Sequence, residues 1–238
     1  MKTGFAGFPL EGIKFLRGLK KNNQRDWFQP RKEMFDTAVK APMVELVAAL
    51  QRDIEKTAPD YIQDPAKCVY RIYRDTRFSK NKTPYKTMIS AAIKKQGLGR
   101  DGSAVFYFHI SPDEVLLAAG SYRPGPEELR ALRNYLAEHH AAFAKLCRAP
   151  KLRAALGELQ GEQLTRVPKG FDAGHPAADL LRRKQFFFWR NLDPAIATTP
   201  ELYKHLSQAL RAALPVMEFL NTPLAGLPKP DDTRFLRD

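Results

Sequence analysis

The sequence contains little cysteine and no long hydrophobic segment. Its two cysteines, Cys68 and Cys147, are far apart, and neither belongs to a Cys-x-x-Cys pair or to a His/Cys cluster with metal-ligand spacing. This pattern excludes a disulfide-rich secreted scaffold, and it predicts no metal site and no cofactor. No apolar run approaches the roughly 20 residues that span a bilayer, and no secretory signal follows Lys2. We therefore expect a cytoplasmic protein that makes no contact with a membrane.

The sequence also lacks the short motifs that identify common enzyme classes. It has no Walker-type phosphate loop, no Gly-x-Ser-x-Gly elbow and no His-Glu-x-x-His pair. The spacing Gly97-x-Gly99-x-x-Gly102 matches the glycine pattern of dinucleotide-binding proteins. In those proteins the pattern leads into a helix, whereas here it leads into an expected strand, so we reject a dinucleotide site. No metal-ligand set is formed by His139, His140, His175 and His205. Enzymatic activity therefore has no motif to support it.

Acidic residues are scarce relative to basic ones. The 238 residues include 39 Lys and Arg against 26 Asp and Glu, which gives 39 − 26 = +13 and a sequence pI near 9.8. A chain this basic favours an anionic partner. Because 44% of the residues are apolar, the chain can bury a substantial core, and its length fits one domain over residues 1–238. We expect the Pro-rich stretch 223–238 to pack loosely as a tail.

Hydrophobic periodicity predicts an α+β protein. Helical spacing of apolar residues predicts helices over 9–21, 26–59, 126–150, 152–159 and 201–214, with a kink or restart at Pro42. Alternating, β-branched and aromatic residues predict strands over 67–74, 87–95, 104–110 and 114–122, with a further strand over 185–190. We therefore expect an antiparallel sheet of about four to six strands, packed with N-terminal, central and C-terminal helices.

Basic residues concentrate between Lys67 and Arg100. These 34 residues contain ten Lys and Arg against Asp75 alone, a balance of 10 − 1 = +9. Their centre, residues 70–86, is expected to run from a strand into a loop, and loops on a rigid sheet commonly hold binding groups. The residues expected to contact a ligand are Arg71, Tyr73, Arg74, Arg77, Ser79, Lys80, Asn81, Lys82, Tyr85 and Lys86.

The chemistry of this set favours a phosphate-bearing ligand. Arginine binds phosphate with two parallel hydrogen bonds, and lysines add mobile positive charges around the same anion. Tyr73 and Tyr85 are of a type that stacks on nucleic-acid bases, and Ser79 and Asn81 can donate hydrogen bonds. We expect Asp75 to orient the neighbouring arginines through ion pairs. Nucleic acid is therefore the leading ligand class.

Three alternatives remain open at this stage. The first is an enzyme acting on a small phosphorylated or carboxylated substrate, in which His109 or Asp75 moves a proton. In that case His109, which shares a strand face with Val105 and Tyr107, must face the arginines; a buried, hydrogen-bonded histidine is the simpler reading. The second makes the basic segment a docking surface for an acidic protein. The third makes it an internal ion-pair brace, and the aromatic residues part of the core.

Several segments resemble one uncharacterised family over nearly the whole chain. The strongest is Tyr73-Arg-Asp-Thr-Arg-Phe-Ser-Lys-Asn-Lys-Thr-Pro-Tyr-Lys86, and Gly7-Phe8-Pro9, Gly120-Ser-Tyr-Arg-Pro124 and Pro168-Lys-Gly-Phe171 accompany it. These segments resemble the family catalogued as domain of unknown function 2461. That family usually has Asp between the two lysines, where this chain has Asn81. The resemblance implies a single α+β domain and one shared motif over 74–86, but no reaction and no catalytic residue.

Overall fold

The computed structural model describes residues 4–98 and 102–227, which form nine α-helices, short helical turns and one sheet. The longer helices are α1 (Leu10–Lys21), α4 (Ala41–Ile54), α6 (Pro126–Cys147), α7 (Pro150–Leu156) and α9 (Glu201–Asn221). The single-turn helices are α2 (Arg25–Phe28), α3 (Lys32–Phe35), α5 (Pro65–Cys68) and α8 (Ala178–Leu181). The remaining turns are η1 (Gln29–Arg31), η2 (Asp36–Lys40), η3 (Pro59–Tyr61), η4 (Pro194–Thr198) and η5 (Thr222–Leu224). No helix within the described ranges is long and apolar enough to cross a membrane.

The sheet has four antiparallel strands in the order β1-β2-β3-β4. The strands are β1 (Ile89–Lys94), β2 (Val105–Ile110), β3 (Val115–Ser121) and β4 (Phe186–Leu192). Three successive strands thus form a meander, and the late strand predicted around 185–190 joins it beside β3. The predicted α+β class, with one antiparallel sheet and helices in all three parts of the chain, is confirmed.

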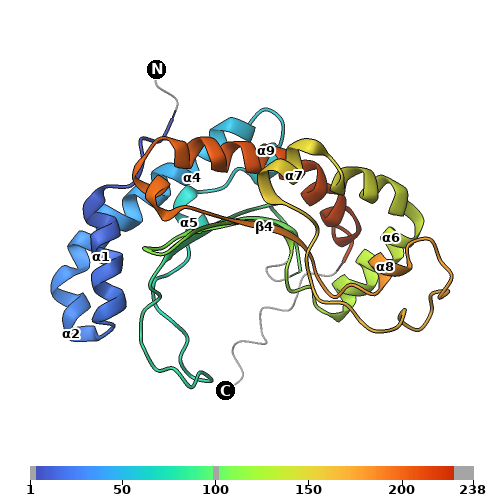
Figure 1. The fold of residues 1–238 in the computed structure, drawn as a ribbon, viewed down its shortest axis with the longest axis horizontal. Coiled ribbons are helices and arrows are strands. Elements are labelled where there is room, and N and C mark those ends of the chain that lie inside the picture. Colours follow the sequence, from blue (N-terminus) through green and yellow to red (C-terminus); the bar gives the residue numbers. More distant parts are fainter. Residues whose placement is uncertain (1–3, 99–101, 228–238) are drawn as a thin grey trace.

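Helices cover one face of the sheet. Figure 1 shows α4, α9 and α7 on the same side of the strands, above a sheet that curves away from them. Phe106, Phe108 and Ile110 alternate along β2 toward this helical layer and are fully buried. Their neighbours in sequence, Tyr107 and His109, therefore point to the opposite, concave face. This alternation divides the sheet into a core face and a second face whose chemistry can differ.

The N-terminal helical region is less regular than its apolar pattern predicts. The helix expected over 26–59 is divided into α2, η1, α3, the π-helical turn η2 and α4. The π turn ends two residues before Pro42, which has no N–H to donate to Ala38 four residues earlier. Helix α4 restarts at Ala41, as expected from the proline. Gly12 of α1 packs against this turn so closely that a β-carbon there would lie 2.1 Å from the Ala38 carbonyl oxygen.

The strand predicted over 67–74 is not formed. Pro65 and the Asp64 side chain, which accepts a 3.0 Å hydrogen bond from the Ala66 N–H, start the short helix α5 instead. The following residues make only isolated bridges, between Val69 and Ala91 and between Tyr73 and Tyr85. At the other end of the chain α9 continues past the predicted residue 214, through Pro215, to Asn221. Residues 228–238 of the expected tail lie outside the described residues.

Asn221 ties the end of α9 to the start of β2. Its Oδ1 accepts a 2.7 Å hydrogen bond from the Ala104 N–H, and its Nδ2 donates to the Ala104 carbonyl at 3.0 Å and to the Tyr61 hydroxyl at 3.1 Å. All three residues are buried. The side chain therefore satisfies backbone groups that no regular strand pairing satisfies.

We predict that Asn221→Ala lowers the free energy of unfolding by about 2–4 kcal/mol, because it leaves buried polar groups unpaired. Urea denaturation monitored by circular dichroism measures the change. The exposed Asn134 of α6 provides the control, since Asn134→Ala should alter stability by no more than about 0.5 kcal/mol. Equal effects at the two positions would contradict the role given to Asn221.

Candidate anion-binding site

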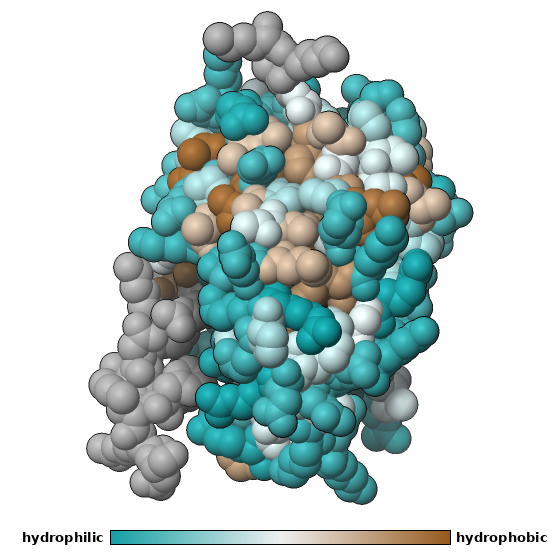
Figure 2. Space-filling model, turned by 90° about the vertical axis from the view of Figure 1, so that its left-hand side faces the viewer, coloured by the Kyte–Doolittle hydropathy of each residue, from teal (hydrophilic) through white to brown (hydrophobic). Residues whose placement is uncertain are grey.

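Residues 70–86 form an irregular hairpin, which we call the basic arm. Figure 1 shows the arm extending from the sheet on the side opposite α4 and α9, next to α1 and α2. Two backbone hydrogen bonds close its base: the Arg74 N–H donates to the Pro84 carbonyl at 2.9 Å, and the Lys86 N–H donates to the Ile72 carbonyl at 2.8 Å. The lower part of the same end of the molecule is largely hydrophilic in Figure 2. The arm therefore presents polar groups on a hydrogen-bonded base.

The base of the arm is anchored to the N-terminal helices. The Asn23 side chain binds both backbone groups of Tyr85, donating to its carbonyl at 2.9 Å and accepting from its N–H at 3.0 Å. The Tyr85 ring is buried and stacks on Phe28, with centroids 4.2 Å apart and planes inclined by 18°. Tyr85 was expected to stack on a ligand base, but its ring is already stacked within the protein. Its role is to hold the arm in place.

Hydrogen bonds within the arm organise its tip. Arg77 donates to the Asp75 carboxylate from Nε at 3.2 Å and from Nη2 at 3.0 Å. These bonds lower the pKa of Asp75 to about 2, so the carboxylate is ionised throughout the ordinary pH range. Asn81 accepts from the Thr83 N–H and hydroxyl at 3.0 and 2.8 Å. Asp75 thus orients Arg77, as its sequence neighbours predict.

Other polar residues of the motif also bond within the arm. Arg74 donates to the Thr83 hydroxyl and, at 3.5 Å, to the Ser79 hydroxyl, and Lys82 donates to the Thr76 carbonyl at 2.9 Å. These partners are uncharged, so the positive charges of Arg74 and Lys82 are not neutralised by them. These hydrogen bonds therefore stabilise the conformation of the arm without neutralising the charges of Arg74 and Lys82.

Within residues 4–98 and 102–227, Arg77 is the arm cation that forms an ion pair. Three others form neither an ion pair nor a side-chain hydrogen bond there: Arg71, Lys80 and Lys86. The Lys86 ammonium lies 5.5 Å from the centre of the Tyr70 ring. Partial burial and the nearby positive charge of Arg71 lower the pKa of Lys86. Two cations held together in this way repel each other, and an anion placed between them would relieve that repulsion.

A cavity of about 280 Å³ lies between the base of the arm and the N-terminal helices. Three cations line it: Arg71 from the arm, Lys32 from α3 and Lys40 from η2. Tyr70 and Tyr73, each nearly half exposed, form part of the same wall. The one carboxylate on the lining is Asp36, which pairs with Lys32 at 2.5 Å. Lys40 and Arg71 are therefore the cations available to an anionic ligand in this cavity.

The π-helical turn explains why the sequence did not reveal the two lysines. In a regular α-helix, eight residues advance by about 80° beyond two full turns, so Lys32 and Lys40 would diverge. The wider π turn between them changes this phase, and both side chains reach the cavity. The proline at residue 42 is the only sequence signal for this irregularity. Arg71 and Tyr73, in contrast, were identified from the sequence and do line the cavity.

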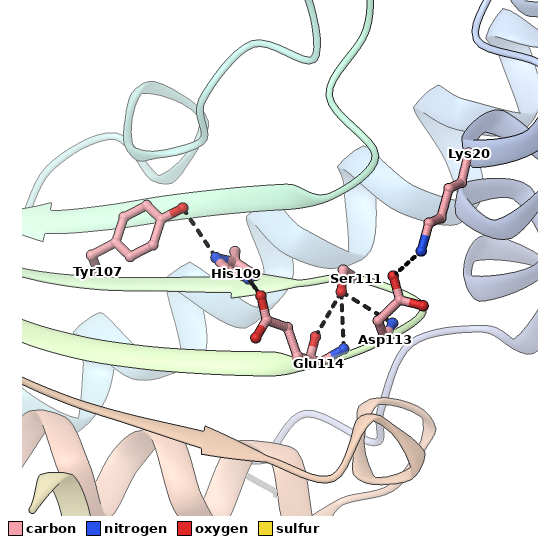
Figure 3. A network of polar contacts seen from close by, with 6 residues as sticks. All are labelled: Lys20, Tyr107, His109, Ser111, Asp113 and Glu114. Atoms are coloured by element: carbon pink, nitrogen blue, oxygen red, sulfur yellow. Dashed lines mark hydrogen bonds and ion pairs between the residues drawn. The ribbon is translucent and has the colours of Figure 1, made fainter.

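His109 belongs to a network of polar contacts that includes Tyr107, Ser111 and Glu114 (Figure 3). Its Nε2 lies 3.0 Å from a Glu114 carboxylate oxygen, and its Nδ1 lies 3.2 Å from the Tyr107 hydroxyl. Ser111 closes the adjacent turn by accepting from the Asp113 and Glu114 N–H groups at 3.1 and 3.0 Å. An imidazole that donates to Glu114 from Nε2 can accept from the Tyr107 hydroxyl at Nδ1. Within the described residues, His109 therefore bonds to a carboxylate and a phenol and not to the arginines that the enzyme alternative requires.

The cysteines and the potential metal ligands give little support to an enzymatic site. Burial raises the pKa of the Cys147 thiol to about 12, despite nearby Arg183, and burial also raises the pKa of Cys68. Neither thiol is therefore an activated nucleophile. Among the described residues no group of three His, Cys, Asp or Glu side chains could hold a metal ion. The arm and its cavity are the site to which the chemistry points.

We predict that His109 makes stability depend on pH. Burial lowers the pKa of His109 below its ordinary value of 6.5, although Glu114 opposes the shift. The unfolded chain then binds the proton more readily, so the stabilisation is present above pH 6.5 and is lost as the pH falls. The slope from one such group is at most about 1.4 kcal/mol per pH unit.

Urea denaturation between pH 7.5 and 5 measures this dependence. His109→Gln can still bond to Glu114 and should flatten the decline, whereas Glu114→Gln removes the charge that favours protonation and should steepen it. His139→Gln, at an exposed position, is the control. Identical profiles for the wild-type protein and His109→Gln would refute the prediction.

Comparison with known proteins identifies a family and no individual relative. No curated protein matches the chain, and no solved structure matches it. One family model matches residues 11–219, a range that begins in α1, includes the basic arm and all four strands, and ends near the end of α9. The chain therefore belongs to the family described as conserved hypothetical protein (DUF2461).

Proposed function

We propose that this protein binds a phosphate-bearing anionic ligand, with nucleic acid as the leading class, through the basic arm and the cavity at its base. The observation that supports the proposal most directly is a group of cations, Arg71, Lys80 and Lys86, that form no ion pair or side-chain hydrogen bond within the described residues. They belong to a segment whose base is hydrogen bonded and packed. Pre-organised cations bind phosphate without the cost of ordering a loose chain.

The arm also offers aromatic rings beside its charges. Phe78 at the tip is 93% exposed, and the Arg77 guanidinium lies 5.6 Å from its ring centre. Tyr73 at the base is 44% exposed. An exposed ring beside a cation suits a ligand that combines a planar base with a phosphate, because the ring stacks on the base and the cation contacts the phosphate.

The internal-brace alternative accounts for only part of this arrangement. Asp75 engages Arg77 alone through hydrogen bonds, and both side chains are largely exposed. An exposed pair of this kind contributes little to stability. A brace made of internal ion pairs would also not explain the presence of Arg71, Lys80 and Lys86. An acidic protein partner remains the main competitor, and the binding experiment distinguishes it.

We predict that the purified protein binds labelled single-stranded DNA or RNA with an affinity that falls steeply with salt. Each contacted phosphate contributes a slope of about −0.7 for a single strand, because binding releases counterions. The triple variant Arg71→Gln/Lys80→Gln/Lys86→Gln should flatten the slope by about 2 units, from three lost contacts. Fluorescence anisotropy across a salt series measures both quantities.

A charge-matched variant controls for net charge. Lys56→Gln/Arg130→Gln/Lys151→Gln removes three exposed cations outside the arm and should leave the slope near that of the wild-type protein. Circular dichroism establishes that each variant is folded. If no oligonucleotide binds at low salt, the nucleic-acid proposal fails, and inorganic phosphate, polyphosphate and acidic proteins are the next ligands to test.

A further inference from the structure

The concave face of the sheet exposes aromatic rings that the core does not use. The pairing register places Ala92, Tyr107, Ala118 and Trp189 in one row across the four strands, so aromatic and small side chains alternate. Trp189 is 39% exposed, and Tyr107 and Ala118 are partly exposed. Neighbouring strands lie about 4.8 Å apart, so alanine leaves a shallow gap between the Tyr107 and Trp189 rings.

One end of this face combines aromatic rings with a cation. Phe187 of β4 pairs with Gly120 of β3. Because glycine has no side chain, no side chain of Gly120 covers the Phe187 ring. Tyr122, 53% exposed, lies just beyond β3 and contacts Phe187 edge to face, with centroids 5.1 Å apart. The Arg123 guanidinium lies 5.5 Å from the centre of the Tyr122 ring. A half-exposed ring and a cation therefore occur together here.

The opposite end of the face repeats this combination where the basic arm begins. Val69 bridges to Ala91 and the Tyr70 N–H donates to the Ser90 carbonyl, so Tyr70 lies alongside the edge of β1. Its ring centre is 6.2 Å from that of Tyr107. Lys86 lies against the same Tyr70 ring. The arm and the sheet face are thus continuous, and Tyr70 joins them.

We call Tyr70, Tyr107, Tyr122, Phe187 and Trp189 the aromatic face. Figure 1 shows the helices α4, α7 and α9 on the other side of the sheet, whereas the arm lies on the side of the aromatic face. Rings on a core-forming sheet normally face its helices, so half-exposed rings here leave apolar area in water without a packing gain. The cations at both ends, Lys86 and Arg123, are suited to phosphates and not to an apolar protein surface.

We propose that the aromatic face stacks the bases of single-stranded nucleic acid whose phosphates the basic arm binds. The inference rests on the proposed function and adds the substrate class to it. Bases in a duplex are stacked on one another and inaccessible, whereas those of a single strand are free to stack on protein rings. Stacking on a ring distinguishes little between sequences, so we expect binding with weak sequence preference.

Trp189 provides a direct readout of stacking. The chain has two tryptophans, so Trp27→Phe leaves Trp189 as the single source of indole fluorescence, and it retains a ring beside Phe15. This variant is titrated at low salt with 12-nucleotide oligo(dT) and oligo(U), and with an abasic strand of the same length. We expect both base-containing strands to quench at least half of the emission, and the abasic strand to bind the arm without quenching.

Substitutions test how much the aromatic rings contribute to the affinity for single-stranded nucleic acid. Trp189→Leu and Tyr122→Leu should each weaken oligo(dT) binding about 10-fold or more, while affinity for the abasic strand stays unchanged. Trp189→Phe keeps a stacking ring and should restore most of the loss. Circular dichroism shows whether each variant is folded.

The outcomes separate this inference from the proposed function. Equal affinity for oligo(dT) and the abasic strand, with no quenching, would overturn base stacking and leave phosphate binding by the arm intact. Absence of binding by all three strands would overturn both. Quenching by both oligo(dT) and oligo(U), with similar affinities, would support the inference.

Discussion

Packing of α4 and α9 against one face of the sheet is the constraint on which the rest of the structure depends. Strand side chains alternate, so burying Phe106, Phe108 and Ile110 beneath these helices forces Tyr107 and His109 to the other face. A shift of the register by one residue would exchange the two sets and place a histidine and a phenol in the apolar layer. The core thus determines which groups the concave face can offer.

The basic arm depends on this core through its base. Tyr85 stacks on Phe28, and Asn23 binds the Tyr85 backbone from the N-terminal helical region. The repulsion among closely spaced cations would favour an extended, mobile chain in the absence of such anchors. The anchors, together with the hydrogen bonds of Arg74, Arg77 and Lys82 within the arm, oppose that tendency. These contacts therefore hold the positive charges of the arm in a defined arrangement.

Three features adjoin one another: the arm, the cavity lined by Lys40 and Arg71, and the aromatic face. Tyr70 belongs to all three, because it lies in the arm, lines the cavity and contacts Tyr107. The His109–Glu114 pair meets this region at the Tyr107 hydroxyl, which lies 3.2 Å from His109 Nδ1. The pair orients the Tyr107 hydroxyl, and within the described residues its hydrogen bonds do not extend to an arm cation.

The sequence by itself determined the α+β class, the meander, the late strand, the location of the positive charge and the motif that marks the family, because composition and periodicity are local properties of the chain. Tertiary structure decided the rest. It left Val69 and Tyr73 in isolated bridges to Ala91 and Tyr85 where a strand was expected over 67–74. It buried Tyr85, brought Lys40 to Arg71 through a π turn, and aligned Trp189 with Tyr107 across strands that are some 80 residues apart in sequence. Such contacts depend on register and packing between distant segments, which no local pattern encodes.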